Sequence, residues 1–365
     1  MITAGLRRAI LAAVGLEGAE DGDPLLRPGP VPGSYASSLP FRLARPGRNP
    51  REEAAALVGR LAGEPWIAAA EVTGPGFLTV TVTHDALAGL AVRIAQAGPA
   101  CAHSDALRGR VVPAAPPGPL AAAPGWPQAR AAFAAQLTAR LAAAAGATVF
   151  PDPERASVPA PAPPSAAQPE GRSAAQPMAL PGDGPVAEAA RYAGADAVRF
   201  VLARMPPGGS VGSPAPEAAV IARQVLANPA YAVRYAHAAA AAVLRWAAAL
   251  GTRPAGFTSR LLAEPGELAL LDALSWLPER VAMAARRGRP DEFAGYLAEL
   301  AARTIDTMST TGFTTISSIS SERLWLADAA RTGLAAPEIT LHDCAIESMR
   351  HSRLSAEPSG VPSSK

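Results

Sequence analysis

The sequence is almost without lysine, since the only one among 365 residues is the last, Lys365. Arginine therefore supplies nearly all of the positive charge, and the formal net charge is only +2. A chain with no internal lysine cannot form a Walker A phosphate loop or a lysine Schiff base, because both need an ε-ammonium group. A net charge this small also gives no strong basic field that would by itself indicate nucleic-acid binding.

Cysteine is nearly absent as well. Cys101 and Cys344 lie far apart, which is too few for a disulfide framework or a zinc site and is typical of the reducing cytosol. We therefore expect a cytoplasmic protein without a metal or another cofactor. His342-Asp343-Cys344 lies in a region predicted to be disordered, where nothing would hold a catalytic triad. No catalytic residue is expected.

The chain also lacks a long uninterrupted apolar run. The alanine-rich residues 236–250 include His237, Arg245 and Trp246, so the stretch is too short and too polar to span a bilayer. We expect no membrane partner.

Composition divides the chain into four parts. Residues 1–110 predict an α+β module, 111–185 a Pro/Ala-rich linker, 186–336 an all-α helical bundle, and 337–365 a disordered tail. The linker holds 16 of the 38 prolines, and such sequences form extended spacers rather than cores. Within it, residues 126–145 predict an alanine-rich helix, which is either solvated or a docking segment.

Apolar periodicity predicts the elements of both folded parts. In the bundle the apolar residues recur every three or four positions, which indicates five or six packed helices. Asn49 and Asn228 are good N-caps, and each is followed by a proline that suits the first helical position. The expected helices are 1–16, 50–61, 85–97, 186–204, 216–227, 229–250, 267–287, 291–307 and 321–334, and the expected strands, joined by Gly74-Pro75-Gly76, are 66–72 and 77–83.

The helix predicted after Asn228 carries the most informative side chains. Tyr231 and Tyr235 are four residues apart and share one face beside Arg234. Two phenols and a guanidinium on one face can stack on unpaired bases and hold phosphate. Arg245, later in the same helix, completes this predicted RNA-binding set. The alternative, in which both tyrosines are core aromatics with their hydroxyls at the surface, stays open.

Five short motifs resemble the arginyl-tRNA synthetases. Two of them are similar to the anticodon-binding domain of that family, named DALR after its motif, and three are similar to its amino-terminal module. The motifs are Gly194-Ala195-Asp196-Ala197-Val198-Arg199-Phe200 and Asn228–His237 for the former, and Gly33–Ser37, Asn49-Pro50-Arg51-Glu52 and Gly74-Pro75-Gly76-Phe77 for the latter.

The resemblance implies an α+β amino-terminal module followed by an all-α bundle of the DALR type. It implies tRNA, arginine tRNA among others, as the partner, with the first module at the tRNA elbow. It adds Tyr35 and Phe77 to the predicted RNA-binding residues. This chain departs from the family pattern at Ala232 and Ala239, where an aromatic residue and an arginine are replaced, so stacking on the anticodon is expected to be weaker.

The resemblance also shows what is missing. The family holds ATP with a His-x-Gly-His motif and a Lys-Met-Ser-Lys loop, and this sequence contains neither. A doubly wound catalytic sheet needs roughly 120 residues at ~30 per βαβ unit, and the predicted linker is shorter than this.

We therefore predict a non-catalytic relative that binds tRNA or a tRNA-like RNA. Two alternatives stay open, a ligase that acts only with a partner and a protein-binding adaptor without RNA. A full-length arginyl-tRNA synthetase is a possible protein partner, and DNA is not expected. If RNA binding has been lost, Arg234, Arg245 and the arginines of residues 286–289 should fall on different faces.

Overall fold

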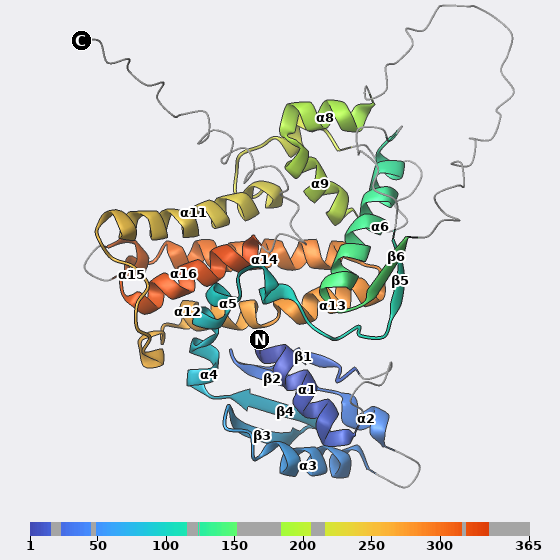
Figure 1. The fold of residues 1–365 in the computed structure, drawn as a ribbon, viewed down its shortest axis with the longest axis vertical. Coiled ribbons are helices and arrows are strands. Elements are labelled where there is room, and N and C mark those ends of the chain that lie inside the picture. Colours follow the sequence, from blue (N-terminus) through green and yellow to red (C-terminus); the bar gives the residue numbers. More distant parts are fainter. Residues whose placement is uncertain are drawn as a thin grey trace, which may run out of the picture.

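Figure 1 shows the computed structural model as an α+β module packed against a larger helical part. The structure describes residues 1–15, 23–44, 49–114, 123, 125–151, 184–205, 216–315 and 319–335. The predicted tail, residues 337–365, lies outside the described residues, as does much of the predicted linker. The predicted fold class, an α+β module followed by a helical bundle, is confirmed.

The amino-terminal module is built on a four-stranded antiparallel sheet in the order β1-β2-β4-β3. Helix α1 (Ile2–Val14) packs against α3 (Pro50–Leu61), and α3 in turn packs against β3 and β4. A short helix, α2 (Leu39–Leu43), also contacts α3. The strands are β1 (Leu26–Pro28), β2 (Ser34–Ser37), β3 (Ile67–Thr73) and β4 (Phe77–Val82).

Two of the sequence motifs meet in this module. The Asn49 side chain accepts a hydrogen bond from the Arg51 N–H at 3.0 Å and so caps α3 as predicted. The β3–β4 turn lies against the same helix start, where a Cβ on Gly76 would stand 2.8 Å from Pro50 Cβ. Gly76 also has a φ of 139°, so only glycine fits this close approach.

The chain then leaves the sheet and enters the helical part. Helix α4 (His84–Ala88) is followed by α5 (Leu90–Ala97) and by the 3₁₀ helix η1 (Gly98–Ala102). Helix α5 and η1 both pack against α16 (Ser321–Leu334), the last helix described. Residues from the predicted first module therefore complete the core of the bundle.

The helical bundle is arranged around α14 (Pro290–Met308), which contacts six other long helices among the described residues. Two predicted helices are each divided in two, at Gly194, where φ is 92°, and at Trp276. The helix predicted over 216–227 is only four residues long. The remaining elements are α8 (Pro185–Ala193), α9 (Ala195–Arg204), α10 (Ala218–Ile221), α11 (Pro229–Ala249), η3 (Ser259–Leu261), α12 (Pro265–Ser275), α13 (Leu277–Arg287) and α15 (Thr311–Thr314).

The linker prediction is wrong for its first half. Strand β5 (Val111–Ala114) pairs in parallel with β6 (Thr148–Pro151), and α6 (Trp126–Ala144) connects them. Helix α6 packs on α13 and α9 because Phe133, Leu137 and Leu141 form a buried stripe at helical spacing. The docking interpretation of this helix is therefore the correct one.

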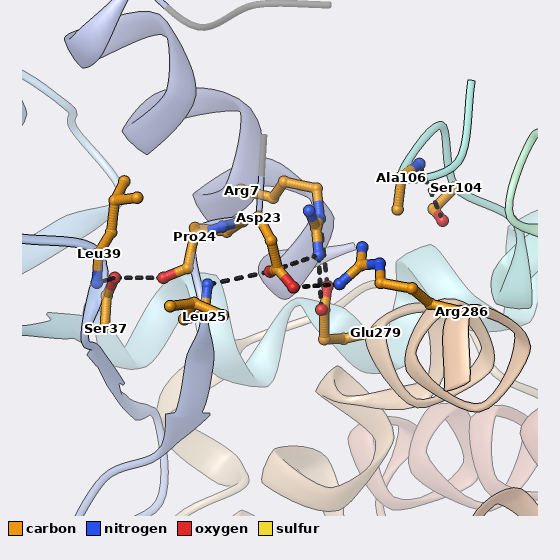
Figure 2. Close-up of polar contacts among 10 residues, drawn as sticks. All are labelled: Arg7, Asp23, Pro24, Leu25, Ser37, Leu39, Ser104, Ala106, Glu279 and Arg286. Atoms are coloured by element: carbon orange, nitrogen blue, oxygen red, sulfur yellow. Dashed lines mark hydrogen bonds and ion pairs between the residues drawn. The ribbon is translucent and has the colours of Figure 1, made fainter. Parts of the chain in front are cut away.

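A buried ion pair joins the two modules directly. Arg7 on α1 donates to Glu279 on α13 with Nη2–Oε1 and Nε–Oε2 distances of 2.6 and 3.2 Å. The two side chains are only 3% and 5% exposed. Figure 2 shows Asp23 and Arg286 extending the pair into a four-residue network, in which Arg7 and Asp23 are 3.5 Å apart and Arg286 bonds to Asp23. The modules are thus packed on each other, rather than held together only by a linker as we predicted.

Hydrogen bonds at α12 strengthen this junction. Thr3 Oγ1 donates to the Ser275 carbonyl at 2.6 Å, and the Gly33 N–H donates to Asp272 Oδ1 at 2.9 Å. Further along the junction, His84 Nε2 lies 2.9 Å from the Leu262 carbonyl oxygen. These contacts join residues far apart in sequence and connect the amino-terminal module to the helical part at several points.

We predict that Arg7→Ala lowers the free energy of unfolding by about 3–5 kcal/mol, because it leaves the Glu279 carboxylate buried without its partner. Urea denaturation would measure this. The double variant Arg7→Met/Glu279→Leu should recover most of the loss. The matched control Arg303→Ala removes an exposed pair with Glu299 and should cost less than about 1 kcal/mol. Equal losses for Arg7→Ala and Arg303→Ala would contradict the prediction.

Candidate nucleic-acid interface

The start of α11 is fixed by Asn228. Its Oδ1 accepts a hydrogen bond from the Ala230 N–H at 3.2 Å, and its Nδ2 donates to the carbonyls of Ile221 and Arg223 at 2.9 and 2.7 Å. One side chain therefore caps the helix and also holds the preceding loop against it. Pro229 occupies the first helical position, as predicted.

Helical periodicity divides α11 into an inner and an outer face. Val233, Ala236 and Ala240 are buried on the inner face, with which α11 packs on α14 and α16. Tyr231 and Tyr235 lie on the opposite side, with ring centroids 5.9 Å apart and an interplanar angle of 30°. Tyr235 is 44% exposed and Tyr231 is partly exposed, so neither is a core aromatic.

The outer face of α11 is positively charged. From 218 to 263 the sequence contains no aspartate or glutamate but five arginines, namely Arg223, Arg234, Arg245, Arg253 and Arg260. Arg234 lies between the two tyrosines in sequence, and its Nε is buried without a hydrogen-bond partner in the described part of the chain. Arg245 is exposed on the same face. An anion is therefore the natural partner of this face.

The other arginine cluster is neutralised within the fold. Arg286 bonds to Asp23 at the module junction, Arg287 lies 3.0 Å from Glu292, and Arg289 lies 2.6 Å from Asp291. Arg234 and Arg245 thus share one face, while the arginines of residues 286–289 serve ion pairs elsewhere. The three groups therefore do not lie on one face, which is the arrangement expected if RNA binding had been lost, although Arg234 and Arg245 depart from it by sharing the α11 face. The arginines of residues 286–289 have a structural role.

A groove opens beside the start of α11. Its volume is about 600 Å³, and its walls come from α9, α10 and the loop before α11. Phe200 and Ile221 give it apolar walls, while Arg204, Arg223 and the acidic Glu217 supply charge of both signs. The sequence did not predict this groove, because three separate segments form it and no sequence motif indicates that they lie together.

The amino-terminal module presents a second aromatic position. The Phe77 ring packs on Phe41, with centroids 4.9 Å apart and an interplanar angle of 56°. Phe77 is partly exposed and lines a cavity of about 450 Å³ together with Arg27 and Thr79. The strand that carries Arg27, β1, was not predicted, so the sequence did not indicate that Arg27 and Phe77 line one cavity.

Tyr35, in contrast, cannot contact RNA in this structure. Its side chain is fully buried, and its ring packs on Trp276 with centroids 5.4 Å apart. Its hydroxyl donates to Ser275 Oγ at 2.8 Å, and burial raises the pKa of Tyr35 well above its ordinary value. The prediction is corrected because β2, which carries Tyr35, faces α12 across the module junction.

Asp196 and Arg199, in the motif at the start of α9, form an ion pair of 3.3 Å. They lie three residues apart on one helix and support that helix locally.

None of the helices in the described ranges has the length and apolar character needed to span a bilayer.

Comparison with known families finds two matches. Residues 1–82 match the arginyl tRNA synthetase N terminal domain, and residues 233–336 match the DALR anticodon binding domain. The first match contains the sheet that carries Phe77, and the second contains most of α11.

Curated relatives are bacterial arginine–tRNA ligases. The ligase of Frankia alni is 37% identical over 139 residues, which are 34% of this chain and 25% of the ligase. That of Clavibacter sepedonicus is 35% identical over 159 residues, 40% of this chain and 28% of the ligase. The chain thus matches about a quarter of the length of these relatives. It carries an arginyl-tRNA synthetase amino-terminal domain and a DALR anticodon-binding domain.

Proposed function

We propose that this protein binds tRNA, or an RNA folded like tRNA, without activating an amino acid. The observation that carries the proposal is the outer face of α11, where two tyrosines and two arginines stand on a helix that has no acidic residue. Aromatic rings accept unpaired bases by stacking, and guanidinium groups pair with phosphate in a bidentate manner. The DALR domain, to which this helix belongs, points to tRNA binding.

The packed module junction supports recognition of a folded RNA. The Arg7–Glu279 pair and the hydrogen bonds at α12 hold the Phe77 cavity and the α11 face in one fixed relation. Two sites held rigidly act together only on a partner whose shape matches their separation. A tRNA, or an RNA of similar shape, is such a partner.

The absence of amino-acid activation is proposed on chemical grounds. The sequence has no internal lysine for a Lys-Met-Ser-Lys loop and no His-x-Gly-His motif. Within the described residues, β5, α6 and β6 form one βαβ unit, and its two strands are the only parallel pair. A doubly wound sheet would need several such units. A cytoplasmic location and a full-length arginyl-tRNA synthetase as a partner stay predictions.

We predict that Tyr235→Ala weakens tRNA binding by about 1–3 kcal/mol, the value of one base stacked on an aromatic ring. Filter binding with labelled tRNA would measure it. Tyr35→Phe is the matched control, because Tyr35 is buried at the junction. It should lower stability by about 1 kcal/mol through loss of one hydrogen bond and leave tRNA affinity unchanged. Equal tRNA affinity of Tyr235→Ala and the unmodified protein would argue against the α11 face.

Salt dependence tests the charge of the same face. The logarithm of the tRNA association constant should fall linearly with the logarithm of salt concentration, and Arg234→Ala should reduce the slope by about 0.7–0.9, the contribution of one phosphate contact. Arg303→Ala, which removes an exposed arginine paired with Glu299, should leave the slope unchanged. Failure of the protein to retain any tRNA at low salt would end the proposal.

Catalysis is tested separately. The purified chain with arginine, ATP, tRNA and labelled pyrophosphate should give no arginine-dependent exchange of pyrophosphate into ATP, because the sequence offers no internal lysine to stabilise the phosphates as they part. The same assay with an added arginyl-tRNA synthetase shows whether the chain changes the activity of a partner. Exchange by the chain alone would show that it is a ligase.

A further inference from the structure

The outer face of α11 carries the same kind of residue pair twice, an arginine followed by an aromatic residue. The pairs are Arg234-Tyr235 and Arg245-Trp246, and they are eleven residues apart within one unbroken helix. Eleven residues make about three turns at 3.6 residues per turn. The second pair therefore points in nearly the same direction as the first, about 16 Å further along the helix at 1.5 Å per residue.

The second pair is accessible. Trp246 is 36% exposed, close to the 44% of Tyr235, and Arg245 is exposed. Between the two pairs, the outer face holds the exposed alanines Ala238 and Ala242. Alanine side chains are short and do not project beyond the neighbouring aromatic rings. A ligand lying along this face could therefore contact both pairs. A single exposed tryptophan is common on protein surfaces and needs no explanation. Two arginine–aromatic pairs aligned on a helix face without Asp or Glu are unusual and indicate a binding role.

We propose that Arg245 and Trp246 form a second RNA contact, which binds the same single strand as Arg234 and Tyr235. The inference rests on the proposed function and deepens it. Unpaired bases can reach both rings, whereas a duplex keeps its base faces stacked inside. A stacked strand rises about 3.4 Å per nucleotide, so the distance between the pairs corresponds to about five nucleotide steps. The ligand is therefore an unpaired strand of at least six nucleotides or so.

The test uses the full chain and fluorescein-labelled oligouridylates, a trinucleotide and a nonanucleotide, in anisotropy titrations. Only the nonanucleotide is long enough to reach both pairs. Trp246→Ala should weaken nonanucleotide binding by roughly 5- to 100-fold, the equivalent of one lost stacking platform. It should change trinucleotide binding by no more than about twofold, because either pair alone can hold a short strand.

Two further variants separate stacking from other effects. Trp246→Phe keeps an aromatic ring and should retain most of the affinity for the nonanucleotide. Leu261→Ala removes an exposed apolar side chain from η3, outside α11, and should have no effect. Circular dichroism and melting temperature would verify that each variant folds like the unmodified protein.

The outcomes distinguish the two proposals. If Tyr235→Ala weakens nonanucleotide binding and Trp246→Ala does not, the second contact is refuted and the proposed function stands. If Trp246→Ala weakens both oligonucleotides equally, the two pairs do not share one strand and the inference also fails. If neither tRNA nor the nonanucleotide binds the unmodified protein, the proposed function itself is lost.

Discussion

The architecture depends on the buried ion pair between Arg7 and Glu279. Taking both charges out of water costs several kcal/mol per ion, and only their close geometry offsets this cost. An ion pair of this kind tolerates little displacement, because its energy depends on excellent geometry. It therefore favours the arrangement of the amino-terminal module on the bundle in which both Glu279 carboxylate oxygens meet Arg7.

An aromatic and cationic stack extends this constraint into the bundle. Tyr35 packs on Trp276, and the Arg280 guanidinium lies 5.7 Å from the Trp276 ring and 5.9 Å from that of Tyr296. Tyr296 in turn donates a hydrogen bond to the Ala273 carbonyl at 2.8 Å. This chain of contacts leads from the sheet to α14, against which α11 packs. The Phe77 cavity and the α11 face are thus linked through a continuous packed interior.

Local signals predicted much of the secondary structure. Asn49, Asn228 and the prolines after them marked two helix starts because capping and proline geometry are properties of adjacent residues. The strands β1 and β2 were missed because Arg27-Pro28 and Ser34-Tyr35-Ala36-Ser37 contain no β-branched residue. In the structure β2 pairs with β4, and β1 pairs with β2. Helix α6 was placed in a linker because proline content dominated its surroundings, although Phe133, Leu137 and Leu141 already formed an apolar stripe at helical spacing.

The α11 face was predicted because helical spacing puts Tyr231, Arg234 and Tyr235 together.

The sequence by itself determined the two folded regions, the resemblance of their motifs to the arginyl-tRNA synthetases, and the absence of an internal lysine, because composition and local spacing contain that information. Only the tertiary structure decided that Tyr35 is buried, that residues 84–102 complete the bundle, and that Arg286 pairs with Asp23. Each of these depends on partners more than 170 positions away in the chain. Burial and charge pairing are properties of the space around a side chain, and no local pattern records them.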